Sequence, residues 1–290
     1  LPKMREGFLD ASIMVAYLKQ GERDAESLLA ATAKADRILT QIEEMVAANS
    51  HYISIARTPA DLYSDKRMGR KSIMLGIENG LALNDNIANV KHFAQRGVVY
   101  ITLCHNGDNS LCDSARGCNT HNGVSRFGAQ VIQEMNRQGI MVDLSHAAEK
   151  SFYDALEISR LPIVCSHSSV RSLCDHPRNL TDEQMRALSQ KGGVAQITLY
   201  SGFLRKEGEA TVMDALAHLE HAIRVMGIDH VGIGTDFDGD GGVRGIADSS
   251  EIINFTRQLL ARRYSESDIQ KIWGGNFLRV MGQVQAVKQK

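Results

Sequence analysis

The chain has 290 residues, 43% hydrophobic and 23% charged, which is enough to bury one large core or two small ones. Its 33 Lys and Arg residues nearly balance its 34 Asp and Glu residues, so we expect no general attraction to phosphate backbones and no nucleic-acid partner. The longest apolar runs, such as GVVYITL, fall short of the roughly 20 residues that span a bilayer, so we expect no membrane span in this chain.

Short runs of apolar and β-branched residues predict seven strands buried on both faces, as the strands of a parallel sheet are. In chain order, these runs are residues 11–18, 72–78, 98–105, 139–146, 162–168, 193–200 and 230–237.

Stretches with helical spacing lie between the predicted strands, and their ends carry stop and start signals. Thr181 is expected to cap one helix, and Gly139, Gly192 and Gly227 fall where helices should end. Strands that alternate with helices indicate a parallel sheet, and without a low-complexity linker we expect a single domain over residues 1–290. The predicted helices are residues 24–48, 84–96, 124–138, 147–160, 181–191 and 211–226.

The pattern fits two α/β architectures, an open doubly wound sheet and a (β/α)8 barrel. Neither glycine-rich nucleotide-binding motif occurs, which disfavours the open sheet. In a barrel, the active site is built from the carboxyl ends of several strands. Five runs end on reactive side chains, and we therefore predict an α/β fold of the (β/α)8 TIM-barrel type. Because only seven strands are visible, we expect the first strand upstream of Leu1. The five strand-end residues are Glu78, His105, His146, His167 and Asp236.

These strand ends offer the ligand types of a divalent transition metal, above all zinc, and a carboxylate can bridge two such ions. A structural reading stays open for each residue. A single buried histidine at a strand end is more often hydrogen-bonded than metal-bound, and Glu78 is equally suited to capping the helix that follows. A calcium loop at Asp236 is disfavoured, because Ala247 stands where a bidentate Glu is required.

The remaining histidines and the cysteines are weaker candidates. His218 and His221 are expected on the outer face of their helix, and His121 is a weak candidate for substrate contact. The five cysteines fit a reduced protein better than a disulfide framework. We interpret Cys112 and Cys118 as free loop thiols, with a disulfide or a metal pair as the alternative.

Seven segments of the chain, taken in their order along the sequence, resemble the membrane dipeptidase family, the zinc dipeptidases that include renal dipeptidase and many bacterial relatives. The resemblance covers almost the whole chain, and the ordered set is highly specific. It implies a TIM-type barrel of the metal-dependent hydrolase kind and a zinc metallodipeptidase that hydrolyses the peptide bond of dipeptides with a free C-terminal carboxylate. The segments are GIENG, YITLCHNGDN, MVDLSH, PIVCSHSSVRSLCDHPRNLTDEQM, GGVAQITLYSGFL, VGIGTDFDG and WGGNFLRV.

The resemblance implies metal ligands position by position. Glu78 matches the carboxylate that bridges two zinc ions, and His146 and His167 match the histidines that complete the second zinc site. Family members carry a His-x-Asp motif on their first strand that completes the first site. This chain has no such motif before its second strand, so we expect the first site to be incomplete in this chain.

The resemblance also implies catalytic and substrate-binding residues. Asp236 matches the acid-base aspartate beside the bridging water. His105 matches the histidine that binds the substrate and stabilises the oxyanion of the tetrahedral intermediate. Arg178 matches the arginine that holds the terminal carboxylate of the dipeptide. The implied mechanism is attack of a zinc-bridging hydroxide on the peptide carbonyl, with the proton relayed by Asp236.

Other assignments stay open at this point. Cys174 occupies a position that is disulfide-bonded in the renal enzyme, but no cysteine follows it, so a bacterial-type, untethered enzyme fits better. The oligomeric state is undetermined, with a homodimer as one expectation, and a cytoplasmic location is slightly favoured over a periplasmic one. The alternative functions are another metal-dependent amidohydrolase, acting on a cyclic amide or lactone, and a non-catalytic metal-binding barrel if the His-x-Asp motif is absent.

Overall fold

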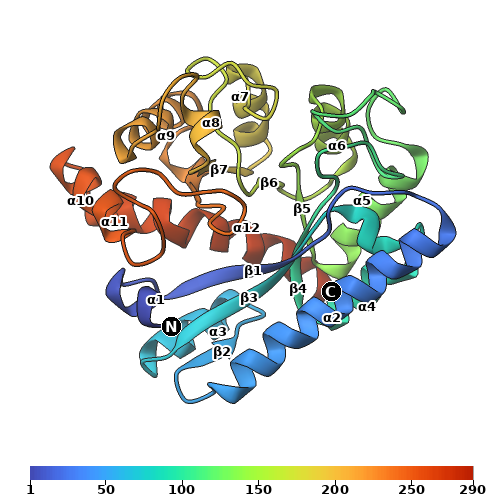
Figure 1. Ribbon diagram of the computed structural model, residues 1–290, viewed down its shortest axis with the longest axis horizontal. Helices are drawn as coiled ribbons and strands as arrows, with labels where there is room; N and C mark the ends of the chain where they lie inside the picture. Colours follow the sequence, from blue (N-terminus) through green and yellow to red (C-terminus); the bar gives the residue numbers. More distant parts are fainter. Residues whose placement is uncertain (290) are drawn as a thin grey trace. The chain divides into compact units, whose positions relative to one another are not determined.

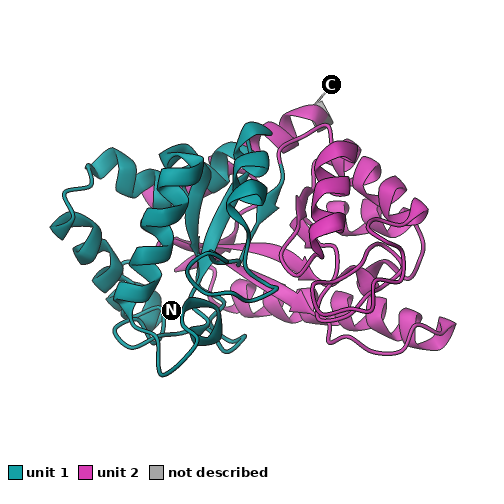
Figure 2. Ribbon diagram, turned by 90° about the horizontal axis from the view of Figure 1, so that it is seen from above, with its two compact units in different colours: residues 1–9, 163–280 teal, residues 10–162, 281–290 magenta. Residues whose placement is uncertain are grey.

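The structure, a computed structural model, describes residues 1–289 and divides into two compact units. Unit 1 comprises Leu1–Leu9 and Ile163–Val280, and unit 2 comprises Asp10–Pro162 and the segment that begins at Met281 (Figure 2). The prediction of a single domain over residues 1–290, made because no low-complexity linker occurs, stays a prediction. None of the helices within residues 1–289 is both long enough and apolar enough to cross a membrane.

Unit 2 is built on a parallel sheet whose central strand is β3. Strand β1 pairs with β3 along its whole length, from Ala11 opposite Ser72 to Tyr17 opposite Glu78 (Figure 1). Strands β2 and β4 therefore follow one another along the opposite edge of β3, and β4 in turn pairs with β5. The strands are β1 (Ala11–Tyr17), β2 (Ile53–Ile55), β3 (Lys71–Glu78), β4 (Val98–Thr102) and β5 (Met141–Asp143).

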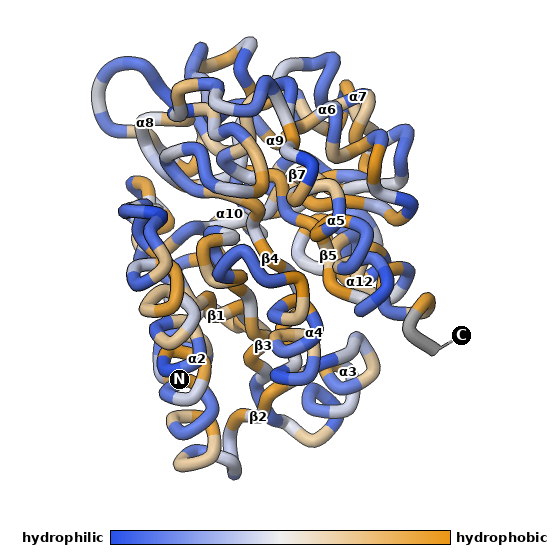
Figure 3. Tube along the Cα trace, turned by 90° about the vertical axis from the view of Figure 1, so that its right-hand side faces the viewer, coloured by the Kyte–Doolittle hydropathy of each residue, from blue (hydrophilic) through white to orange (hydrophobic). Residues whose placement is uncertain are grey.

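Helices cover this sheet with their apolar faces. Along α2, hydrophobic and hydrophilic residues alternate at helical spacing (Figure 3), and the buried residues, which include Leu39 and Val46, form one face. Burial of each such side chain contributes about 1.5–3 kcal/mol. The elements are α2 (Ala25–Ala48), α3 (Pro59–Arg67), η1 (Gly80–Leu83), α4 (Ala88–Gln95), α5 (Arg126–Gln138), α6 (Glu149–Ile158) and η4 (Ala286–Gln289).

Unit 1 contains a second set of parallel strands, in which β7 pairs with both β6 and β8. Thr181 caps α7 through a capping box with Gln184, as its position in the sequence predicts. The elements are α1 (Pro2–Glu6), β6 (Val164–Cys165), α7 (Asp182–Gln190), β7 (Val194–Thr198), α8 (Ser201–Leu204), α9 (Val212–Met226), η2 (Ile228–His230), β8 (Val231–Gly234), α10 (Ile253–Ala261), α11 (Glu266–Gln270), the π-helical turn η3 (Lys271–Gly275) and α12 (Asn276–Gln285), whose last residues belong to unit 2.

The seven predicted strands and six predicted helices are all present, and the helix stops at Gly139 and Gly227 are confirmed. Two differences are informative. Strand β2 was not predicted, because three residues are too few to show a periodicity. The strand predicted over residues 139–146 ends at Asp143, so Ser145 and His146 lie in the loop that follows it.

Candidate metal centre

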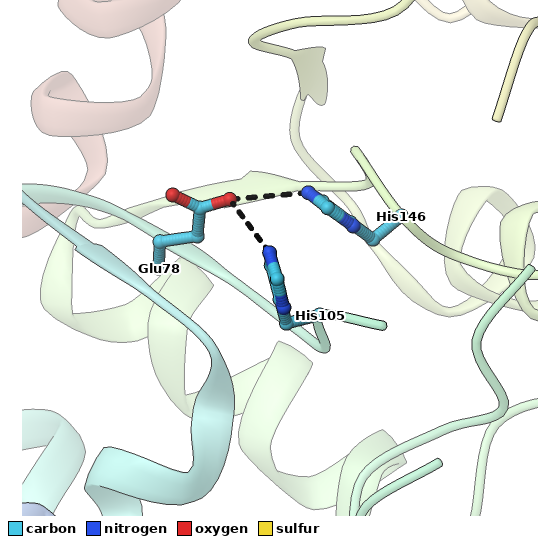
Figure 4. Close-up of side chains that lie close together, drawn as sticks. All are labelled: Glu78, His105 and His146. Carbon is cyan, nitrogen blue, oxygen red and sulfur yellow. Dashed lines mark hydrogen bonds and ion pairs between the residues drawn. The ribbon is translucent and has the colours of Figure 1, made fainter. Parts of the chain in front are cut away.

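Three side chains of unit 2, Glu78, His105 and His146, point toward one another at the carboxyl ends of their strands (Figure 4). Glu78 is the last residue of β3, whereas His105 and His146 follow β4 and β5. Nε2 of His146 lies 3.1 Å and Nε2 of His105 lies 3.8 Å from Oε1 of Glu78. One ligand atom from each of the three residues lies within 4.8 Å of the others. Adjacent parallel strands thus bring distant residues into one cluster.

The cluster is largely removed from water. Glu78 and His146 are 9% and 6% exposed, and His105 is half-buried. The ring centroids of His105 and His146 lie 4.2 Å apart, and the ring of Tyr17 makes an edge contact with the ring of His105. Burial, together with the negative charge of Glu78, raises the pKa of the Tyr17 hydroxyl. A carboxylate buried beside imidazoles is expensive unless a proton or a cation compensates its charge.

The backbone at His146 is held in a sparsely populated conformation. Its φ is +73°, in the left-handed region that non-glycine residues rarely adopt. The carbonyl of His146 accepts hydrogen bonds from the Ala115 amide at 2.8 Å and from the Ser114 hydroxyl at 3.3 Å. The same hydroxyl contacts the carbonyl of His105 at 2.5 Å. Ser114 therefore links the two histidine-bearing loops, and these contacts stabilise the strained backbone.

The donor set and its spacing fit a zinc ion. Zinc binds imidazole nitrogen and carboxylate oxygen at 2.0–2.2 Å in tetrahedral geometry, which places two ligand atoms about 3.3 Å apart. The 3.1 Å separation of His146 and Glu78 matches this spacing, whereas the 3.8 Å separation of His105 from Glu78 is wider. Glu78 and His146 therefore fit a common ion better than His105 does.

The other sequence-predicted site residues, His167, Arg178 and Asp236, belong to unit 1. His167 follows β6, and its Nδ1 lies 2.8 Å from the Ser166 hydroxyl. Arg178 is 3% exposed, donates through Nη2 to the carbonyl of His167 at 3.1 Å, and stacks over the Phe203 ring. Within unit 1, the structure therefore brings Arg178 to the backbone of His167.

Asp236 follows β8 and begins a tight loop. Its φ is +53°, and its carbonyl accepts hydrogen bonds from the amides of Gly239 and Gly241. The glycines let the backbone pass close to this residue, because a Cβ at Gly241 would lie 2.3 Å from the Asp236 carbonyl oxygen. The sequence-predicted acid therefore occupies a tightly folded strand end.

Some structural alternatives are resolved. Glu78 does not cap the helix after β3, since the side chain of Asn79 accepts the hydrogen bond from the Leu81 amide. The prediction that His218 lies on an outer face is wrong. His218 is 1% exposed, accepts from the Val170 amide and donates to the Leu204 carbonyl. Burial lowers the pKa of His218 to about 4, so its ring is neutral near pH 7.

The remaining loop candidates have structural partners. His121 lies 2.7 Å from the carbonyl of Asn109 through Nε2, and its amide donates to Asp113. Among the residues that the structure describes, all five cysteines are free thiols, with Cys112 buried and Cys118 exposed.

Sequence reasoning missed two residues around the cluster, Asn106 and Ser114. The side-chain oxygen of Asn106 lies 3.1 Å from Nδ1 of His146. Asn106 stands beside His105 in the sequence, but that position carries no sign that its contact is with the ring of His146. Ser114 stands in a polar loop that gives no signal at all.

A parallel α/β architecture with a carboxylate and imidazoles gathered at strand ends is typical of metal-dependent hydrolases. Within that class, the sequence model described as membrane dipeptidase (peptidase family M19) matches residues 1–290, and the chain belongs to this family.

Curated relatives support this membership. The chain is 38% identical over 226 residues to an uncharacterized dipeptidase of Schizosaccharomyces pombe, which covers 76% of this chain and 54% of the relative. It is 31% identical over 296 residues to dipeptidase 3 of Mus musculus, which covers 100% of this chain and 58% of the relative. The chain thus spans somewhat more than half the length of these relatives.

Solved structures confirm the predicted fold class. The probable dipeptidase PvdM from Pseudomonas aeruginosa matches with a TM-score of 0.94 and 26% identity, over 99% of this chain and 88% of that chain. An amidohydrolase from Pseudomonas aeruginosa matches with a TM-score of 0.86 and 28% identity, over 98% of this chain and 92% of that chain. The α/β fold of the TIM-barrel type expected for a metal-dependent hydrolase is therefore confirmed.

Proposed function

We propose that the protein is a metal-dependent dipeptidase that hydrolyses the peptide bond of dipeptides with a free C-terminal carboxylate. The observation that carries this proposal is the cluster of Glu78, His105 and His146 in a chain of the membrane dipeptidase family. The curated relatives are described as dipeptidases, which supports dipeptides as the substrate class.

We assign the metal ligands as Glu78, His146 and His167. The support is the 3.1 Å separation of Glu78 and His146 and the position of His167 after β6. When bound, the cation would polarise the scissile carbonyl and lower the pKa of a water molecule from 15.7 towards about 7. Zinc as the metal, and two as the number of ions, stay predictions that elemental analysis of the purified protein tests.

Three further residues carry the steps that the protein itself performs. Asp236 accepts a proton from the attacking water and returns it to the leaving amine. His105 donates a hydrogen bond to the developing oxyanion, which contributes about 3 kcal/mol if it resembles other oxyanion donors. The position of His105 supports this role, because its Nε2 lies 3.8 Å from Oε1 of Glu78 and its ring is half-buried.

Arg178 selects the substrate by binding its terminal carboxylate. A guanidinium presents two parallel N–H donors that match a carboxylate, and a buried one makes the stronger pair. The support is that Arg178 is 3% exposed and its orientation is set by the His167 carbonyl and the Phe203 ring. Because the carboxylate must then lie near the scissile bond, longer peptides would not fit.

The test compares a dipeptide with the corresponding dipeptide amide, which lacks the free carboxylate. Arg178→Met should lower kcat/KM for the dipeptide by at least about 30-fold, because truncating one partner of a buried charge pair costs about 2 kcal/mol or more. The amide should be affected far less. The matched control is Arg171→Met, since the Arg171 guanidinium donates to the carbonyl of Pro177.

Two outcomes would count against the assignment. Equal losses on both substrates would remove the role of Arg178. A metal-loaded protein that hydrolyses cyclic amides or lactones, but not dipeptides, would favour the broader amidohydrolase class over a dipeptidase.

A homodimer also stays a prediction, and light scattering of the purified protein tests it.

A further inference from the structure

The ring of His146 has contacts on both of its nitrogens. Nε2 lies 3.1 Å from Oε1 of Glu78, and Nδ1 lies 3.1 Å from Oδ1 of Asn106. A neutral imidazole carries one N–H, so one nitrogen donates and the other accepts. Both partners are acceptor oxygens, so a neutral ring donates to only one of them, and the lone pair of its other nitrogen faces an oxygen.

An amide oxygen accepts hydrogen bonds and does not donate them. When Nδ1 of His146 donates to the oxygen of Asn106, Nε2 presents a lone pair toward Glu78. A lone pair facing a carboxylate oxygen at this distance is unfavourable until a cation or a second proton lies between them. The arrangement therefore favours a cation beside Nε2 and Glu78.

Contacts to the residues that follow Asn106 hold its backbone in place on the C-terminal side. The side chain of Gln20 donates to the carbonyl of Asp108 at 3.0 Å, and a Cβ at Gly107 would lie 2.8 Å from Cγ of Gln20. The buried carboxylate of Asp108 accepts hydrogen bonds from the amides of Ser114, Cys118 and Thr120, and from the Thr120 hydroxyl.

The backbone is also held on its N-terminal side, where the Ser114 hydroxyl contacts the carbonyl of His105 at 2.5 Å. Anchored on both sides, Asn106 is placed against the ring of His146 by the loop rather than by chance. Its own side chain is exposed, so it contributes little to the buried core.

We propose that Asn106 is a positioning residue whose amide oxygen fixes the tautomer and orientation of the His146 ring, so that Nε2 is available to a divalent cation. The inference rests on the proposed function in taking His146 as a metal ligand. Histidines that bind metals commonly donate their other N–H to an acceptor of this kind, and loss of such a partner costs about 10- to 100-fold in metal affinity.

The test uses the purified protein and three variants. Asn106→Ala removes the acceptor, and Asn106→Asp keeps an acceptor oxygen at the same reach. Asn49→Ala is the control, because it removes another side-chain amide of unit 2, which donates to the carbonyl of Met45.

Two readouts are independent of catalysis. Zn²⁺ affinity is measured by competition with a chromogenic chelator, and the tautomer of His146 is read from the ring ¹⁵N shifts of the metal-free protein, assigned with His146→Gln. Asn106→Ala should lower Zn²⁺ affinity by about 10-fold and mix the tautomers. Asn106→Asp should restore both, and Asn49→Ala should change neither.

The inference is overturned if Asn106→Ala leaves tautomer and affinity as in the wild type, or if Asn106→Asp is as impaired as Asn106→Ala. Failure of the proposed function is a separate result. A wild-type protein that binds Zn²⁺ in an Asn106-dependent way but leaves dipeptides intact would refute the dipeptidase and leave the role of Asn106 standing.

Discussion

Nε2 of His146 lies 3.1 Å from Oε1 of Glu78, although 68 positions separate the two residues in the sequence. They meet because β3, β4 and β5 are adjacent parallel strands, whose carboxyl ends lie at the same edge of the sheet. Both residues belong to the proposed metal site, and the first prediction concerns this pair directly.

Replacing His146 by Gln should reduce Zn²⁺ affinity by more than about 100-fold, because even the outer partners of a metal ligand cost about 10- to 100-fold when removed. Dialysis followed by elemental analysis measures the bound metal. The matched control is His92→Gln, since Nε2 of His92 also contacts a carboxylate, that of Asp36 at 2.8 Å, away from the cluster. Unchanged metal content in His146→Gln would remove His146 from the ligand set.

Asp236→Asn should lower kcat by about 100- to 10,000-fold, the usual contribution of a general acid-base group. An amide of the same shape cannot take up the proton, but it leaves the loop hydrogen bonds to the Asp236 carbonyl in place. KM should therefore change little. Asp238→Asn, in the same loop, serves as the control, and equal effects of the two variants would argue for a loss of loop structure rather than of proton transfer.

The buried His218 should make the free energy of unfolding fall as the pH drops below about 6.5. Its pKa is about 4 in the folded protein, because burial disfavours the charged ring, and near 6.5 when unfolded. Between these values the unfolded chain binds more protons, so acid favours unfolding. From pH 7 to pH 5, this one group should cost about 2 kcal/mol.

The measurement is urea denaturation at pH 7 and pH 5 of the wild type and of His218→Gln. The variant should lose about 2 kcal/mol less over this interval, whatever its stability at pH 7. His51→Gln is the control, because His51 is exposed. A pH dependence of His218→Gln equal to that of the wild type would show that the ring is already charged in the folded protein.

Asp108→Ala should destabilise the loop after β4 by about 2 kcal/mol, because it removes the acceptor of one buried and three partly buried hydrogen bonds. Burial alone would raise the pKa of this carboxyl, but the hydrogen bonds from Ser114, Thr120 and Cys118 hold it below its usual value. Hydrogen exchange of the Ser114 amide gives a local measure. Thr120→Val, which removes only one of these donors, should have a smaller effect, and the reverse order would contradict the role given to Asp108.

The local sequence was sufficient to predict seven of the strands, six of the helices and the strand-end residues. Apolar runs without alternation indicated strands buried on both faces, and each predicted run contains a strand of the structure. Glu78, His105 and His146 could be singled out because polar groups at the end of a buried strand need a partner. The helix start at Thr181 and the stop at Gly139 were readable because capping involves only residues close in the chain.

By itself, then, the sequence determined seven strands and six helices, the residues at the strand ends, and the family resemblance that the order of its segments carries. Only the tertiary structure decided which side chains contact one another: the 3.1 Å pair of Glu78 and His146, the link through Ser114, the partner of His146 at Asn106, and the burial of His218. The physical reason is that periodicity and capping arise from neighbours along the chain. A hydrogen bond between loops depends instead on how separate strands pair, and a local sequence pattern carries no information about that pairing.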